Sequence, residues 1–94
     1  MSIHTPLTLR EIRSLVIGRR AAASVQRLEI GGERRLTLET QIDSEPADLS
    51  AELAAIDDLI VAVDEPGWTT IESRGTWSRD GRMTWECRQR RGGS

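Results

Sequence analysis

The 94-residue sequence contains no phenylalanine, tyrosine, lysine or asparagine, and its only aromatic residues are three tryptophans. All 13 cationic residues are therefore arginines. A core without phenylalanine or tyrosine must be built largely from aliphatic side chains, with tryptophan filling the widest spaces. With 37% hydrophobic and 30% charged residues, the composition indicates one small folded domain over residues 1–94 and excludes a disordered chain.

Cysteine and long apolar runs are equally scarce. Cys87 is the only cysteine, so the chain can form no internal disulfide and holds too few thiolates for a zinc site. No apolar run approaches the roughly 18 residues that a membrane span needs. The first residues lack the basic segment and apolar stretch of a secretory signal. We therefore expect a soluble, cytoplasmic protein that uses no metal or cofactor.

The sequence also offers little material for catalysis. His4 is the only histidine, and it precedes the first predicted helix, where no partner can hold it in place. Cys87 has no evident base beside it. Asp57 and Asp58 diverge by about 100° on a helix and do not converge on one substrate. The segment 31–33 precedes a strand, whereas a phosphate loop precedes a helix. These observations predict a protein that is not an enzyme.

Two helices are predicted from capping signals and periodicity. Thr8 and Glu11 form a capping box, so the first helix begins at Thr8. It ends near Gly18 or continues through the alanine-rich segment 19–24. The second helix spans about residues 48–64, between an acidic N-terminal turn and Pro66. Its apolar stripe has i, i+4, i+7 spacing and consists of Leu49, Leu53, Ile56, Ile60 and Val63.

Residues 25–42 are predicted to form a hairpin around Gly31 and Gly32. A two-residue loop would place Leu28 opposite Arg35 and mix apolar with charged side chains on one face. A three-residue loop over 31–33 instead places Leu28 opposite Leu36, and we predict that register.

Residues 68–89 are predicted to form a second hairpin, with a three-residue loop over 80–82. This register places Trp77 directly opposite Trp85, and we expect both tryptophans in the core. The same face is predicted to carry Ile71, Met83 and Cys87.

The order of helix, two strands, helix and two strands predicts an α+β fold (αββαββ), in which one antiparallel sheet carries both helices on one face. We expect the ordered core to span about residues 7–89. Residues 90–94 are rich in arginine and glycine, and we expect them to form a flexible tail.

The net charge of −2 conceals a strong segregation of charge. Residues 1–35 carry +4, residues 36–65 carry −9 without one arginine, and residues 66–94 carry +3. Either the acidic helix is neutralised by an arginine-bearing sheet, or it faces a cationic partner. On a helical wheel the acids lie on and beside the side opposite the apolar stripe. Our candidate partner-binding residues are Glu52, Asp57, Asp58, Asp64 and Glu65.

The second half of the chain joins this acidic helix to Pro-Gly-Trp-Thr-Thr at residues 66–70, then to a strand, the turn 80–82 and a strand of alternating large residues. Over about residues 27–88 this pattern resembles the YezG-like immunity proteins of bacterial polymorphic toxin systems. In that family a helix ends before a Trp-Thr pair, and a hairpin with a glycine turn follows. The resemblance implies a cytoplasmic, non-enzymatic protein that neutralises a cognate toxin, frequently a nuclease.

Two other functions are compatible with the sequence. A small domain with few aromatics could pair with itself through the alanines of the second helix or through an exposed strand edge, as a homo-oligomeric structural or assembly subunit. Alternatively, the arginine-rich end could bind nucleic acid, although no aromatic side chain is clearly placed for base stacking. The candidate residues for that role are Arg88, Arg90 and Arg91.

Overall fold

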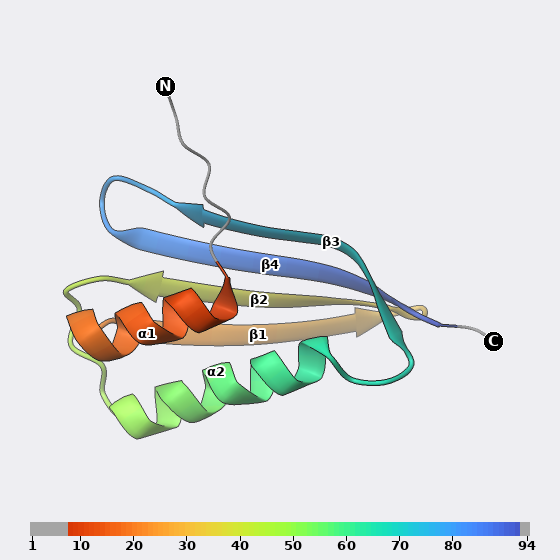
Figure 1. The fold of residues 1–94 in the computed structure, drawn as a ribbon, viewed down its shortest axis with the longest axis horizontal. Helices are drawn as coiled ribbons and strands as arrows, with labels where there is room; N and C mark the ends of the chain where they lie inside the picture. The colour runs from red at the N-terminus through yellow and green to blue at the C-terminus, as the bar shows by residue number, and fades with distance from the viewer. Residues whose placement is uncertain (1–7, 93–94) are drawn as a thin grey trace.

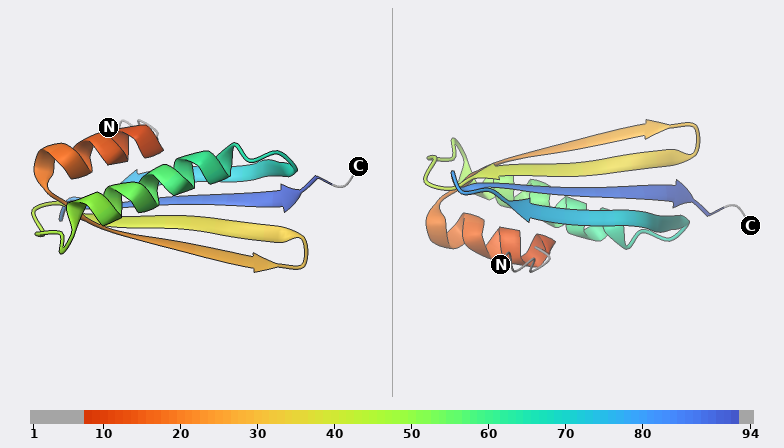
Figure 2. Two further views of the ribbon diagram at one scale, coloured as in Figure 1. Left: turned by 90° about the horizontal axis from the view of Figure 1, so that it is seen from below. Right: turned by 90° about the horizontal axis from the view of Figure 1, so that it is seen from above.

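The computed structural model describes residues 8–92 and confirms the predicted αββαββ order (Figure 1). The elements are α1 (Leu9–Arg19), β1 (Ala22–Ile30), β2 (Glu33–Gln41), α2 (Leu49–Val63), β3 (Trp68–Trp77) and β4 (Arg82–Arg91). The four strands form one antiparallel sheet in the order β1-β2-β4-β3. Both helices cover the same face of this sheet, and the other face is open (Figure 2). No helix within residues 8–92 is long and apolar enough to cross a membrane.

The first helix begins as predicted and ends near the earlier of its two expected ends. Thr8 is the N-cap, and its hydroxyl accepts a hydrogen bond from the Glu11 backbone N–H at 3.2 Å. Arg20 ends the helix in the left-handed conformation, with φ of 50°. The alternative extension over 19–24 is wrong, because this residue turns the chain and β1 begins at Ala22.

The second helix has the predicted bounds. The Asp48 carboxylate caps it by accepting a hydrogen bond from the Ala51 N–H at 3.2 Å, and Asp64 is the C-cap. Ile56, Leu59 and Ala62 are its buried residues. The rest of the predicted apolar stripe packs around them and is partly buried, namely Leu49, Leu53, Ile60 and Val63.

The predicted register of the first hairpin is wrong. The loop has two residues, Gly31 and Gly32, so Ile30 lies opposite Glu33 and Leu28 lies opposite Arg35. Both glycines have positive φ, 59° and 81°, as in a tight turn whose twist matches that of the strands. The turn therefore determines the register, and it rotates the apolar side chains of β1 away from the core. Leu28 and Ile30 are 56% and 69% exposed.

The second hairpin has a three-residue loop, but one position earlier than predicted, at 79–81. Gly81 adopts a φ of 86°, and Trp77 consequently lies opposite Met83. Trp77 and Trp85 share a face as expected, but they are not directly opposed. Trp77 is half exposed, so its predicted place in the core is wrong, whereas Trp85 is buried. Ile71 is also outside the core, because a β-bulge between Thr70 and Glu72 interrupts the alternation of β3.

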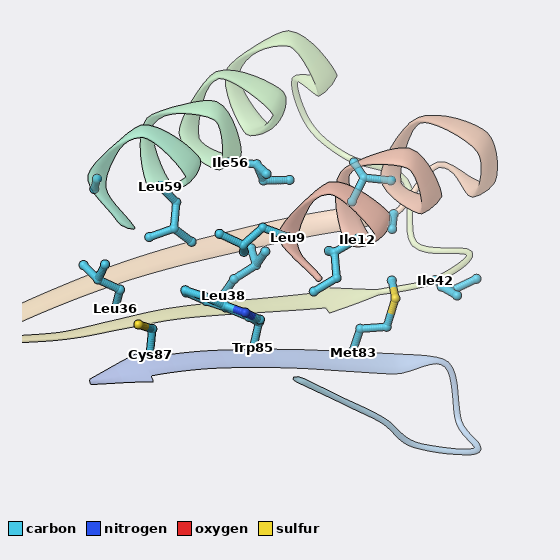
Figure 3. Close-up of a cluster of buried hydrophobic side chains, with 13 residues drawn as sticks. Leu9, Ile12, Leu36, Leu38, Ile42, Ile56, Leu59, Met83, Trp85 and Cys87 are labelled. Carbon is cyan, nitrogen blue, oxygen red and sulfur yellow. The ribbon is translucent and has the colours of Figure 1, made fainter. Parts of the chain in front are cut away.

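The core fills the space between the helices and the central strands β2 and β4 (Figure 3). It is mainly aliphatic, as the composition predicts, and Trp85 is its only buried aromatic side chain among the described residues. The labelled members are Leu9, Ile12, Leu36, Leu38, Ile42, Ile56, Leu59, Met83, Trp85 and Cys87.

The arginine-rich end is part of the sheet. Arg90 and Arg91 belong to β4, and the Gly92 N–H donates to the Gly67 carbonyl at 2.7 Å. The predicted flexible tail over 90–94 is therefore wrong for its first residues, because backbone pairing continues through them. Residues 93–94 lie outside the described part of the chain, as does His4.

Candidate protein-binding surface

The exposed side of α2 carries an apolar residue between two pairs of acids. Val61 is 71% exposed, more than any other exposed large hydrophobic residue in the described chain. Asp57 and Asp58 precede it by four and three positions, and Asp64 and Glu65 follow it by three and four. On a helix the spacings of Asp57, Asp58 and the C-cap Asp64 place them one turn from Val61 on the same side, and Glu65 follows just beyond the helix end. We call these five residues the Val61 face.

Two acids of the Val61 face are paired within the domain. Asp57 accepts a hydrogen bond from Arg13 of α1 at 2.7 Å, and Glu65 lies 3.5 Å from a guanidinium nitrogen of Arg34. Asp58 and Asp64 form no ion pair with any described residue. An exposed pair such as that of Asp57 contributes about 0–1 kcal/mol, so a partner could displace Arg13 at little cost. The surface thus retains negative charge.

Glu52 does not belong to this surface. It lies nine residues before Val61, which is half a turn around the helix axis, and it is partly buried. Its Oε2 atom is buried without a hydrogen-bond partner among the described residues. The structure therefore places Asp57, Asp58 and Asp64 around Val61, whereas Glu65 lies beyond the helix end with its carboxylate at Arg34, and Glu52 lies apart from all four.

The Val61 face has few other side chains that could interfere with a partner. Ala51 and Ala54 are exposed on the preceding turns, and α2 contains no arginine. An ordinary solvated helix usually carries long side chains of both signs. The exposed side of α2 is therefore a smooth surface of one sign with an apolar centre.

A buried arginine holds the C-terminal end of α2 in place. Arg34 of β2 is 4% exposed, and it donates hydrogen bonds to the Ala62 carbonyl at 2.6 Å and to Gln89 Oε1 at 2.7 Å. The Gln89 amide in turn donates to the Val63 carbonyl at 2.9 Å. The Arg34 guanidinium also lies 4.2 Å from the ring centre of Trp68.

This cluster supplies a positive charge at the C-terminal end of α2. The last turn of α2 contains no basic residue, although a cation there is favoured by the helix dipole. Arg34 supplies that cation from the sheet and satisfies a terminal carbonyl. The sequence does not predict this role: the expected register places Arg34 opposite Ile30 on the apolar face near the turn, but it identifies no partner for the guanidinium. The only signal was an arginine alternating with the buried residues of β2.

The open face of the sheet carries charges of both signs, many of them paired. Arg35 lies 3.6 Å from Glu86, and Arg88 lies 3.5 Å from Glu72. Arg74 lies 3.9 Å from the same glutamate. These pairs give the open face a mixed charge, which neither a polyanion nor a polycation would favour.

The three arginines considered for nucleic acid do not form one surface. Arg88 and Arg90 alternate with the buried Gln89 and lie on the open face, whereas Arg91 lies on the other side of the strand. Arg91 also contacts Glu29 at 3.3 Å.

Two groups of the described chain have a shifted pKa, Cys87 and Asp80. Burial raises the pKa of the Cys87 thiol above its ordinary value of 9.0, which keeps it protonated and weakly nucleophilic at neutral pH. Hydrogen bonds from Ser78 and from the Arg82 N–H lower the pKa of Asp80, which lies in an exposed turn. Within residues 8–92, no group of three or more histidine, cysteine or acidic side chains is placed to hold a metal ion.

Comparisons of this chain with protein-family models, curated proteins and solved structures found no match. The resemblance to YezG-like immunity proteins therefore stays a prediction. The functional argument rests on the residues themselves.

Proposed function

We propose that this protein is a non-enzymatic protein-binding domain that uses the Val61 face to engage a cationic surface of another protein. The observation that carries the proposal is the placement of Val61 between two pairs of acids on the exposed side of α2. Protein interfaces commonly place an apolar anchor at the centre and polar or charged groups at the rim. The Val61 face has that arrangement within two turns of one helix.

The two parts of the face have different physical roles. Burying an exposed valine side chain contributes about 1.5–3 kcal/mol at most, which stabilises a complex but selects few partners. The acids attract a cationic partner over a distance set by the Debye length, about 8 Å at physiological ionic strength. They therefore accelerate association and exclude anionic surfaces, while Val61 lengthens the lifetime of the complex.

The partner that this chemistry fits best is a basic toxin, as the resemblance to immunity proteins implies. A nuclease must present a cationic surface to bind phosphates, so an acidic helix can occupy that surface in place of nucleic acid. The inhibitor needs no chemistry of its own. The burial and protonation of Cys87 are compatible with this role.

The proposal can be tested with two charge-matched variants. The first carries Asp58→Arg and Asp64→Arg on the Val61 face, and the second carries Glu33→Arg and Glu39→Arg on the open face of the sheet. All four acids are exposed and form no ion pair with a described residue, so neither variant breaks an internal contact. Each variant replaces two acids by two arginines and therefore changes the net charge by the same amount. Tagged proteins are used to capture partners from the cells that produce them, and eluted proteins are identified by mass spectrometry.

We expect the wild type and the Glu33/Glu39 variant to capture the same basic protein, and the Asp58/Asp64 variant to lose it. The captured protein, produced alone, should inhibit growth, and co-production of the wild-type domain should relieve the inhibition. Equal capture by both variants, or equal loss, would contradict a specific role of the Val61 face. If the captured protein does not inhibit growth, the proposal of protein binding stands and the proposal that the partner is a toxin is contradicted.

A further inference from the structure

The free edge of β1 is long and has little protection against pairing. β1 is an end strand of nine residues, and in Figure 2 the tip of the β1-β2 hairpin extends away from both helices. Two apolar side chains, Leu28 and Ile30, are exposed near that tip. Edge strands of monomeric proteins are usually shortened, covered or interrupted by proline, because a free edge invites pairing with another strand. β1 has nine residues and no proline, residues 26–30 are all exposed, and its only protection against pairing is the two charged residues Arg27 and Glu29.

The turn determines which backbone groups of β1 are free. In a two-residue hairpin loop, the Glu33 N–H bonds the Ile30 carbonyl, so these two residues form a hydrogen-bonded pair. Hydrogen-bonded and non-bonded pairs alternate along an antiparallel ladder. Even-numbered residues of β1 therefore direct their N–H and C=O groups to β2. Val25, Arg27 and Glu29 direct theirs to the open edge.

We infer that a second copy of this protein pairs with β1 across a two-fold axis at Leu28, so that two four-stranded sheets join into one sheet of eight. In this register Arg27 lies directly opposite Glu29 of the partner subunit, and the symmetric pair repeats the contact. Both residues are odd-numbered, so they form the hydrogen-bonded pairs of the new ladder. Leu28 meets Leu28 of the partner subunit on the open face of the sheet.

Charge selects this register among the symmetric ones that the backbone allows. A two-fold axis at Arg27 would place two arginines directly opposite each other, which is unfavourable. An axis at Gln26 would place Arg27 opposite Val25 of the partner subunit and leave its charge unpaired. Only the axis at Leu28 places opposite charges in direct opposition. Arg27 is exposed and forms no ion pair with any described residue of its own chain, and Glu29 has only an exposed contact with Arg91 at 3.3 Å, so both can take part in the new contact.

The same register brings together the exposed apolar residues of the edge. Leu28 is 56% exposed and would pack on its symmetric copy in a non-bonded pair, where side chains approach most closely. Ile30 would lie opposite Gln26 of the partner subunit and diagonal to Leu28. The inference does not depend on the proposed function, because β1 and the Val61 face are different surfaces.

A charge-exchange experiment tests both the dimer and its register. The Arg27→Glu variant places two glutamates opposite each other at both contacts of the dimer, and the Glu29→Arg variant places two arginines there. When the two variants are mixed, a dimer of one chain of each places opposite charges at both contacts. Repulsion is therefore relieved only if the two different chains pair with each other. Sedimentation equilibrium measures self-association of the wild type, of each variant and of the mixture, with Arg79→Glu as a control on an exposed turn. Circular dichroism verifies that each variant is folded.

The mixed dimer has two contacts between residues 27 and 29. At one contact the new glutamate of the first variant faces the new arginine of the second, which is an attractive pair. At the other contact the original Glu29 of the first variant faces the original Arg27 of the second, which is also attractive. Both contacts of the mixed dimer therefore join opposite charges, whereas neither contact of either variant alone does so.

We expect the wild type and the control to dimerise, each edge variant to dimerise at least tenfold more weakly, and the equimolar mixture to recover wild-type affinity.

In a second test, Leu28→Cys should form an intersubunit disulfide on mild oxidation, because Cα atoms of a non-bonded pair lie about 4.5 Å apart. Ser24→Cys should not form one. A wild type that remains monomeric at millimolar concentration would overturn the inference. The free edge of β1 could then pair only with a strand of another protein. A dimer insensitive to both substitutions would overturn the register.

Discussion

At the scale of single residues, the fold depends on one buried cation. Arg34 is nearly inaccessible to solvent, yet its guanidinium contacts a helix carbonyl, a glutamine, a glutamate and a tryptophan ring. A buried charge is tolerated only when it is paired and hydrogen-bonded. Arg34 meets that condition while joining β2 to the end of α2, and so it also fixes the position of the Val61 face.

Replacement of Arg34 by alanine should lower the free energy of unfolding by about 3 kcal/mol, because Gln89 Oε1 loses its buried donor, the Ala62 carbonyl loses its guanidinium partner and the Arg34 side chain leaves a cavity. Arg35→Ala is the matched control. Arg35 is exposed, and its 3.6 Å contact with Glu86 contributes less than about 1 kcal/mol. Urea denaturation measures both losses. Similar losses for the two variants would contradict the structural role of Arg34.

Cys87 should be unreactive in the folded protein and reactive in the unfolded one. Burial raises its pKa, so a thiol reagent at about pH 8 should label it slowly until denaturant is added. The raised pKa also sets the sign of a pH effect. The unfolded thiol ionises near its ordinary value of 9.0, so the contribution of Cys87 to stability is complete below that pH and is lost as the pH rises through the higher folded value. Rapid labelling of Cys87 in the native protein would contradict the burial of its thiol.

At the scale of elements, capping residues predict the ends of helices more reliably than apolar side chains predict which face of a strand is buried. The capping box at Thr8 predicted the start of α1 and the Pro66-Gly67 pair predicted the end of α2, because capping and helix termination are local interactions. The predicted register of the first hairpin is wrong because it relied on the burial of side chains and not on the local conformation of the turn. We placed Leu28 toward the core because it is apolar, whereas the conformation of Gly31 and Gly32 determined the register.

This explanation of the hairpin predicts opposite effects for two glycine substitutions. Gly32 has a φ of 81°, so Gly32→Ala should destabilise the protein by about 1 kcal/mol, since alanine disfavours that conformation. Gly18 lies within α1 with nothing within 4 Å of an added Cβ, so Gly18→Ala should stabilise it by up to about 1 kcal/mol. Thermal unfolding compares the two variants. Equal stabilisation by both alanines would contradict the turn-determined register.

At the scale of the whole molecule, the segregation of charge along the sequence has two outcomes. Part of the acidic segment is neutralised internally, by Arg13 at Asp57 and by Arg34 at Glu65. Another part, Asp58 and Asp64, stays exposed without an ion-pair partner among the described residues. Internal neutralisation of the acidic helix is therefore partial, the cationic partner stays a prediction, and the sequence could not divide the acids between the two outcomes. That division depends on which arginines the tertiary fold brings to α2.

The candidate site was predictable to the extent that it depends on one helix. The helical pattern predicts the exposed acids, but it wrongly groups Glu52 with the others and gives no signal that selects Val61. The free edge of β1 could not be located from sequence, since strand order depends on long-range pairing of β2 with β4. Leu28 and Ile30 became evident as surface residues only once the hairpin register was known.

The central claim is that the Val61 face steers a cationic protein partner into contact. The most direct measurement is the association rate constant with the purified partner as a function of ionic strength, for the wild type and for an Asp58→Asn, Asp64→Asn variant. We predict a steep fall with salt for the wild type, and slower, distinctly less salt-dependent association for the variant, with dissociation little changed. Identical salt dependence of the two association rate constants would contradict the account.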